Sequence, residues 1–142
     1  MLDLLDASVW IPLSAQDHVH HARALRYWEN EASARVAFCR ITALALLRHL
    51  TDGATMRHGV RTSGQAWEFY LEWLRLPEVD FLQEPRGVHE RLGTFSRALT
   101  LGRAQWSDAY LAAFAIEADC RLVTFDRGFS VYPELELLNL EV

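Results

Sequence analysis

The chain has 142 residues, of which 51% are hydrophobic and 23% charged, a composition typical of a folded globular protein rather than a disordered one. Its formal net charge of −5 argues against a broad basic face for nonspecific nucleic-acid binding, although all 14 basic residues are arginines, which bind phosphate well. No apolar run approaches the roughly 20 residues of a membrane span, and the acidic N-terminus does not resemble a signal peptide. We therefore expect one domain, residues 1–142, in the cytoplasm and without a membrane partner.

Short apolar runs alternate along the chain with segments of helical periodicity. The first run ends at Asp6, and Pro12 restricts the chain near the start of the next segment. The expected strands are residues 2–5, 36–39, 79–82, 122–125 and 135–140. The expected helices are residues 18–32, 43–50, 67–74, 88–99 and 111–118. This alternation predicts an α/β fold with helices on both faces of one mostly parallel sheet.

Three aspartates occupy positions where a buried element meets a turn. Asp6 and Asp126 each follow a predicted strand, and Asp108 lies at the start of a predicted helix. Ligands of parallel sheets collect beyond the carboxyl ends of the strands, so we expect these three side chains to converge there. Asp3 and Asp119 lie at strand entries and should face the opposite end of the sheet.

Each aspartate also has an ordinary structural interpretation. Asp108 could cap its helix, and Asp126 could form a turn with Arg127 and Gly128. Taken together, however, carboxylates from distant segments repel one another unless a cation joins them. Hard oxygen ligands favour Mg²⁺, or Mn²⁺, over zinc, so the joint pattern predicts a divalent metal site formed by Asp6, Asp108 and Asp126.

The segments around these acids resemble the ordered motifs of PIN-domain ribonucleases, and most closely those of VapC toxins from VapBC toxin–antitoxin modules. The motifs are DAS at 6–8, ITAL at 41–44, WSDAYLAA at 106–113 and LVTFDRGF at 122–129. The likeness extends over essentially the whole chain. It implies a PIN-like, three-layer α/β/α domain with a central, mostly parallel sheet.

The resemblance also implies an activity, hydrolysis of RNA by a magnesium-dependent endoribonuclease. Asp6 and Asp108 would be the principal metal ligands, and Asp126 would complete the cluster directly or through water. Ser8 and Thr124 match positions whose hydroxyl groups could orient the carboxylates. Substrates of this kind of enzyme are typically structured RNAs, such as transfer or ribosomal RNA.

Partners are implied in the same way. VapC toxins pair with a small VapB-type antitoxin, which carries the operator-binding domain, so this chain would contact DNA only through its partner. Self-association into a homodimer is also expected. No residue spacing in the sequence identifies either surface.

Ala43 departs from the family pattern, because an acidic residue, commonly glutamate, usually stands at the matching helix position. Alanine there either continues the apolar stripe of Leu46, Leu47 and Leu50, weakens metal binding in a natural variant, or reflects a sequence altered to silence a toxic nuclease. Since three aspartates remain, we expect metal binding that is retained but weaker.

Two other functions compete with the ribonuclease interpretation. A phosphatase would also place Asp6 after the first strand, but those enzymes often use a second nearby acid or a lysine, and this chain has Ser8 and no lysine. A noncatalytic PIN-fold interaction protein would be consistent with Ala43. The segment 17–21, DHVHH, invites a metal interpretation, although a solvated helix start explains it equally; Arg48 and Arg127 could contact RNA phosphates.

Overall fold

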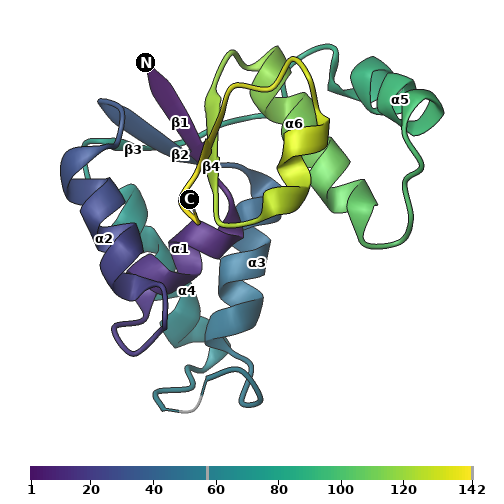
Figure 1. The fold of residues 1–142 in the computed structure, drawn as a ribbon. Helices are drawn as coiled ribbons and strands as arrows, with labels where there is room; N and C mark the ends of the chain where they lie inside the picture. The colour runs from purple at the N-terminus through teal and green to yellow at the C-terminus, as the bar shows by residue number, and fades with distance from the viewer. Residues whose placement is uncertain (57, 142) are drawn as a thin grey trace.

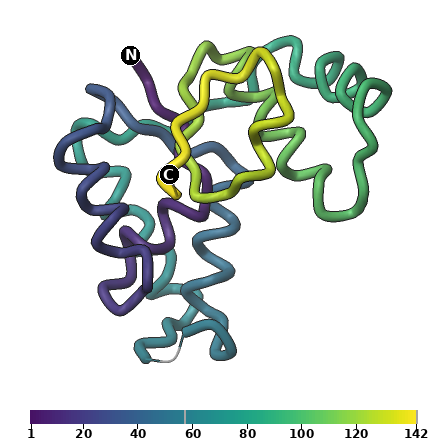
Figure 2. Tube along the Cα trace, in the orientation of Figure 1, coloured from purple at the N-terminus to yellow at the C-terminus, as the bar shows by residue number. Residues whose placement is uncertain are grey.

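The computed structural model describes residues 1–56 and 58–141, and its centre is a five-stranded sheet in which all neighbouring strands run parallel (Figure 1). The strand order is β3-β2-β1-β4-β5, so β1 lies in the middle of the sheet. The strands are β1 Leu2–Leu5, β2 Arg35–Phe38, β3 Val79–Phe81, β4 Arg121–Thr124 and β5 Leu137–Asn139. Figure 2 shows the C-terminal segment, in yellow, ending near the centre of the molecule, and β5 in this segment pairs with β4.

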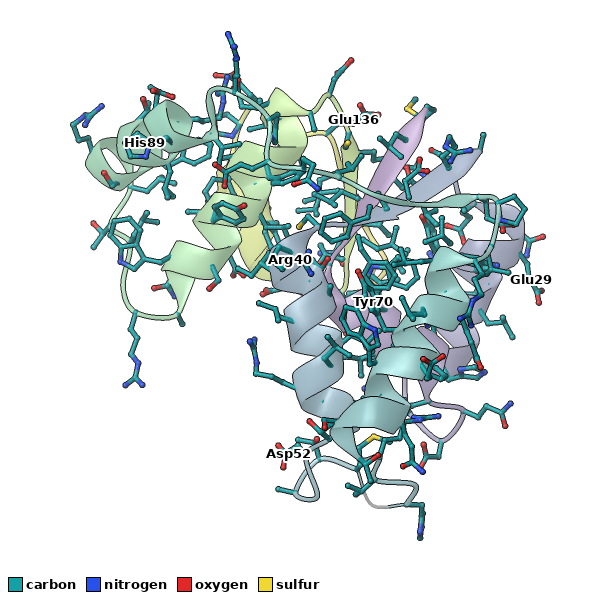
Figure 3. The ribbon with its side chains drawn as sticks, turned by 180° about the vertical axis from the view of Figure 1, so that it is seen from behind. Glu29, Arg40, Asp52, Tyr70, His89 and Glu136 are labelled. Atoms are coloured by element: carbon teal, nitrogen blue, oxygen red, sulfur yellow. The ribbon has the colours of Figure 1, made fainter. Side chains whose placement is uncertain are left out.

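Helices cover both faces of the sheet, which confirms the predicted three-layer α/β/α fold. They are α1 Ala7–Ser14, α2 His21–Asn30, α3 Arg40–Leu50, α4 Ser63–Leu74, α5 Val88–Ala98, α6 Gln105–Glu117 and the 3-10 turn η1 Arg127–Val131. The first four helices pack on one face and the last two on the other (Figures 1 and 3). The sheet has one hydrophobic core on each face, and successive strand residues point to opposite cores. Leu5 and Phe38 pack in one core, and Leu4 and Ala37 pack in the other.

The sequence did not predict α1, because Pro12 suggested a restricted, non-helical connection. Pro12 instead lies inside the helix and is buried. Proline cannot donate a backbone hydrogen bond, and packing of the same helix offsets that loss. Trp10 of this helix stacks on Phe38 at 3.8 Å between ring centroids and meets Trp73 edge-on at 5.2 Å. Tertiary packing therefore outweighs the local propensity here.

Within residues 1–56 and 58–141, none of the helices combines the length and the apolar character that a membrane span requires.

A buried ion pair fastens the amino end of β1. The Asp3 carboxylate is fully buried and accepts two hydrogen bonds from Arg121, at 3.0 and 2.9 Å, and others from Tyr27 and Ser33. Burial by itself raises the pKa of Asp3, but these hydrogen bonds outweigh it and hold the pKa below its ordinary value. The charge of Asp3 is thus balanced locally, far from the carboxyl edge of the sheet.

Arg121→Met is expected to lower the free energy of unfolding by about 3–5 kcal/mol, because it leaves the Asp3 carboxylate buried without its counterion. Urea denaturation followed by tryptophan fluorescence measures this change. Arg75→Met is the matched control, since Arg75 pairs with Glu68 only at the exposed surface and its loss should change stability little. Equal, small effects of both substitutions would contradict the assigned role of the ion pair.

Candidate active site

Asp6 lies at the junction of β1 and α1, and two hydroxyl groups hold its side chain. The Oγ of Ser8 donates to Asp6 Oδ2 at 2.7 Å, and Oγ1 of Thr124 donates to the same oxygen at 2.8 Å. Burial raises the pKa of Asp6, the two hydroxyl hydrogen bonds oppose that rise, and the negative charge of Asp126 adds to it. The hydroxyls therefore orient the carboxylate and favour its ionised form.

The same hydroxyls join the two loops that follow β1 and β4. The N–H of Phe125 donates to Ser8 Oγ at 3.1 Å, and the N–H of Asp126 donates to Thr124 Oγ1 at 2.9 Å. Asp126 Oδ1 in turn accepts the N–H of Gly128 at 2.8 Å, so this aspartate forms the turn that its sequence suggested. Oδ1 of Asp126 therefore takes part in the turn. The Asp126 carboxylate is nevertheless close enough to Asp6 and Asp108 for its charge to affect both.

Asp108 belongs to the first turn of α6, which begins earlier than predicted, at Gln105. The N-cap residue of this helix is Ala104, so Asp108 does not occupy the capping position. Burial, followed by repulsion from the charges of Asp126 and Asp6, raises the pKa of Asp108 to about 6. Asp108 shares a cavity of about 120 Å³ with Asp6 and a larger one of about 790 Å³ with Asp126. The three predicted acids are thus close enough to influence one another's charge, and Asp108 lines a cavity with each of the other two.

The carboxylates fit a hydrated divalent cation better than a tightly caged one. In the described part of the chain, no three side chains of the His, Cys, Asp or Glu type are gathered closely enough to hold one ion directly. Mg²⁺ commonly keeps several waters and uses only one or two protein carboxylates. Burial, and then repulsion from Asp126 and Asp6, raise the pKa of Asp108, and a bound cation would relieve that repulsion.

The structure does not bring Ala43 to this cavity. Ala43 is fully buried and packs in the core formed by α1 to α4, in line with Leu46 and Leu50 on the inward face of α3. Ala43 therefore continues the apolar stripe of α3, as one interpretation of the sequence predicted. The expectation that position 43 faces the metal ligands is wrong. An acid at position 43 would lie in the hydrophobic core.

Ala45 is the α3 residue that faces the acids. Together with Ile41 and Arg48, it lines the cavity that contains Asp6 and Asp108. Two residues along a helix turn the side chain by about 200°, which is why positions 43 and 45 face opposite ways. Sequence reasoning missed Ala45 because it followed the motif rather than the second helical stripe at positions 41, 45 and 48.

The remaining acids and histidines behave differently. Asp119 precedes β4 in a turn with a positive φ of 55°, and Asp3 is bound to Arg121, so neither joins the cluster. His18 and His20 lie in the connection between α1 and α2, and they line a surface cavity together with Ser8 and Asp126.

The acidic side chains lie beyond the carboxyl edge of a parallel sheet, which is where α/β domains of this kind bind their ligands. The chain belongs to the PIN domain family, whose model matches residues 4–135.

Relatives extend this assignment. Ribonuclease VapC41 of Mycobacterium tuberculosis is 35% identical over 140 residues, covering 94% of this chain and 95% of VapC41. The crystal structure of VapC20 from the same species, a toxin that cleaves the sarcin-ricin loop, aligns with a TM-score of 0.68 and 17% identity, covering 94% of this chain and 97% of VapC20. DNA-bound VapBC from Salmonella typhimurium aligns with a TM-score of 0.65 and 17% identity, covering 99% of each chain.

Proposed function

We propose that this chain is an endoribonuclease and the toxin of a type II toxin–antitoxin module, and that it hydrolyses RNA phosphodiester bonds with a divalent metal ion, Mg²⁺ or alternatively Mn²⁺. One observation carries the proposal. Asp6 and Asp108 line a single cavity, and burial, together with repulsion from the charges of Asp126 and Asp6, raises the pKa of Asp108 to about 6. Such a pair suits a cation-dependent reaction on a phosphate.

Asp6, Asp108 and Asp126 would hold the metal, in part through the water molecules bound to it. Ser8 and Thr124 both donate to Oδ2 of Asp6, and these two hydrogen bonds limit rotation of a carboxylate that lines the cavity. A divalent metal, when bound, lowers the pKa of a water molecule and neutralises charge that develops on the phosphate. Two hydrogen bonds hold Asp126 in place: its backbone N–H donates to Thr124 Oγ1, and its side chain accepts from the backbone N–H of Gly128.

Arg48 supports binding of the substrate phosphate. Its exposed side chain lines the cavity of Asp6 and Asp108, and within the described part of the chain it forms no ion pair. A guanidinium group can donate two parallel hydrogen bonds to a phosphate. We propose that it binds the nonbridging oxygens of the cleaved group, opposite the metal-binding acids.

Arg48→Gln is expected to lower kcat/KM for RNA hydrolysis about 10- to 100-fold, the effect of losing one charge-assisted hydrogen bond of about 1.5–3 kcal/mol. Arg48→Lys should recover part of that loss, because lysine keeps the charge but not the paired geometry. Arg75→Gln, at the end of α4, serves as the control. Equal rates for Arg48→Gln and the control would exclude a role for Arg48.

The function itself is tested by incubating the purified chain with transfer and ribosomal RNA, with and without Mg²⁺, and resolving the products on a denaturing gel. Cleavage that EDTA abolishes and Mn²⁺ restores supports the proposal. A VapB-type antitoxin should bind the chain and suppress cleavage, and the toxin should reach operator DNA only in that complex. Partner binding without any RNA cleavage would favour the noncatalytic interaction protein.

A further inference from the structure

A second cavity adjoins the candidate active site, between the loop that precedes α6 and the 3-10 turn η1. It has a volume of about 790 Å³ and is lined by Asp108 and Asp126 together with Leu99 and Val131. Surface cavities of about 300–1,000 Å³ are typical binding sites for small molecules. Asp108 also lines the cavity that contains Arg48, so a ligand that spans both cavities can contact the acids and Arg48 at once.

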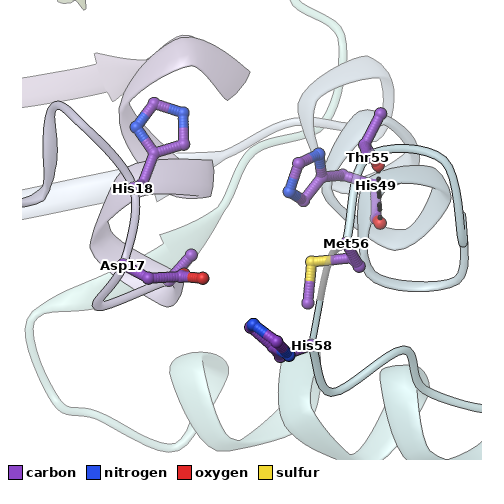
Figure 4. A pocket seen from close by; sticks show the side chains of 7 residues that line it. Asp17, His18, His49, Thr55, Met56 and His58 are labelled. Carbon is purple, nitrogen blue, oxygen red and sulfur yellow. Dashed lines mark hydrogen bonds between the residues drawn. The ribbon is translucent and has the colours of Figure 1, made fainter.

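The position of this cavity distinguishes it from others on the surface. Figure 4 shows a cavity of about 350 Å³ in which His18 faces His49 and His58. Among the described residues that line that cavity, none is an acid of the candidate active site. A ligand bound there would not touch the reacting groups, whereas a ligand beside Asp108 and Asp126 would.

Tyr132 contributes a hydroxyl group without a protein partner. Its side chain is only 4% exposed and lines the cavity, and its ring packs against Phe95 and Phe129 with 4.9 and 6.3 Å between centroids. Burial, and then the negative charges of Asp108 and Asp126, raise the pKa of Tyr132, so its hydroxyl lies near both acids and keeps its proton. Within the described part of the chain, this hydroxyl forms no hydrogen bond, and it is not fully sealed from solvent. A donor that the protein leaves unpaired is available to a ligand.

Gln105 supplies a second donor at the same cavity. Its Oε1 accepts the backbone N–H of Gly102 at 3.0 Å, which fixes the orientation of the side-chain amide. Among the residues that the structure describes, the NH₂ group of this amide has no acceptor, and Gln105 lines the cavity. Together with Tyr132, it gives the cavity two hydrogen-bond donors beside apolar walls.

These features suit a nucleobase better than a phosphate. Asp108 and Asp126 repel a phosphate group that enters without a metal ion, but they do not repel an uncharged base. Leu99 and Val131 can contact the flat face of a base, and unpaired RNA bases are commonly recognised by packing combined with hydrogen bonds to their edges. Donors match the carbonyl acceptors of guanine and uracil, whereas adenine and cytosine present an amino donor at the corresponding position.

We propose that this cavity is a subsite for one nucleobase next to the cleaved phosphodiester bond. Tyr132 and Gln105 donate hydrogen bonds to the edge of that base, and they favour a base with a carbonyl group, guanine or uracil, over adenine or cytosine. The proposal rests on the ribonuclease function proposed above, in which Asp6, Asp108 and Asp126 hold the metal. Tyr132 and Gln105 thus determine which bond in RNA is cleaved rather than how it is hydrolysed.

Inosine and adenosine are a matched pair of probes, because one base has a carbonyl group and the other an amino group at the same ring position. Neither nucleoside contains a phosphodiester bond, so NMR titration can measure their binding in Mg²⁺ without cleavage. We expect inosine to bind at least about fivefold more tightly than adenosine.

Tyr132→Phe removes only the hydroxyl, since the ring keeps its contacts with Phe95 and Phe129. It should abolish most of the preference for inosine and leave adenosine binding unchanged. Tyr110→Phe is the matched control, because it also removes one hydroxyl, from a side chain on α6 that donates to Glu84 at 2.7 Å and does not line the cavity. The control should bind both nucleosides as the unaltered chain does.

Gln105→Glu tests the second donor. The new side chain keeps an oxygen for the N–H of Gly102 but replaces the NH₂ donor by an acceptor. The ratio of inosine to adenosine affinity should therefore fall at least about fivefold. Gln105 is exposed in the first turn of α6, where an acidic side chain is compatible with the helix.

The same preference should appear in RNA. When random-sequence RNA is cleaved in Mg²⁺ and the product ends are sequenced, guanine or uracil should be enriched at one position next to the cut, and Tyr132→Phe should remove most of that enrichment. Equal affinities for inosine and adenosine overturn the proposal, as does an equal loss of preference in Tyr110→Phe. Failure of both nucleosides to bind also overturns it and would favour a protein ligand for the cavity.

Failure of this proposal and failure of the ribonuclease function are distinguishable. RNA cleavage without a preference for inosine overturns the base subsite alone. A preference for inosine that Tyr132→Phe removes, without any RNA cleavage, overturns the nuclease function and retains a base-binding cavity.

Discussion

Asp108→Asn is expected to abolish RNA hydrolysis and, at the same time, to stabilise the folded chain. The rate should fall at least about 100-fold, because we propose that Asp108 binds the metal, and loss of a residue that only supports a metal ligand already lowers activity about 10- to 100-fold. The free energy of unfolding in EDTA should rise by about 1–2 kcal/mol near pH 7.5, after solvent screening of a partly exposed group is allowed for.

The sign follows from the raised pKa. The folded chain binds the Asp108 proton more tightly than the unfolded chain, with a pKa of about 6 against 3.8. The ionised carboxylate therefore destabilises the fold above about pH 6, and the penalty is relieved as the pH falls from about 6 towards 3.8. The advantage of Asp108→Asn should shrink over that same range.

Urea denaturation at several pH values, beside the cleavage assay, measures both effects. Asp119→Asn is the control, because asparagine tolerates the positive φ of that turn and Asp119 lies away from the cluster. Loss of activity together with loss of stability would mean that Asp108 is a structural residue.

Glutamate at positions 43 and 45 should have opposite effects. Ala43→Glu places a carboxylate in the core beside Leu46, and we expect it to lower the free energy of unfolding by at least about 3 kcal/mol. Ala45→Glu adds a carboxylate to the wall shared with Asp6 and Asp108, and we expect it to tighten Mg²⁺ binding about 10-fold with little loss of stability.

Isothermal titration with Mg²⁺ and thermal unfolding of both variants measure these outcomes. Ala45→Gln is the matched control, since it has similar size without the charge. If Ala43→Glu folds normally and binds the metal more tightly while Ala45→Glu does not, our placement of α3 against the acids is wrong.

Much of this architecture was predictable because the strands are short, apolar and followed by acids or turns. The positions of Asp6 and Asp126 could be predicted because each follows an apolar run that indicates a strand. Position 45 was not predictable in this way, since an alanine carries no chemical signal and only the helix rotation distinguishes it from Ala43. The helix around Pro12 depends on Trp10 packing against distant rings, which local propensity does not contain.

The surface cavity lined by His18, His49 and Phe125 was not predictable for a related reason. The segment at 17–21 signalled polar side chains but not their neighbours, because His49 and Phe125 come from elements far away in the sequence. The backbone N–H of His20 also donates to His18 Nδ1, so this nitrogen is engaged in a hydrogen bond that the sequence did not indicate.

The hydroxyl bridge from Thr124 to Asp6 spans 118 positions of the chain. A ribosome must therefore synthesise nearly the whole polypeptide before the first acid acquires its final orientation. A nascent or prematurely terminated product that lacks β4 would contain Asp6 and Asp108 but no assembled centre. For a protein that attacks RNA, this order of synthesis would protect the translating ribosome until the chain is released and its antitoxin can bind.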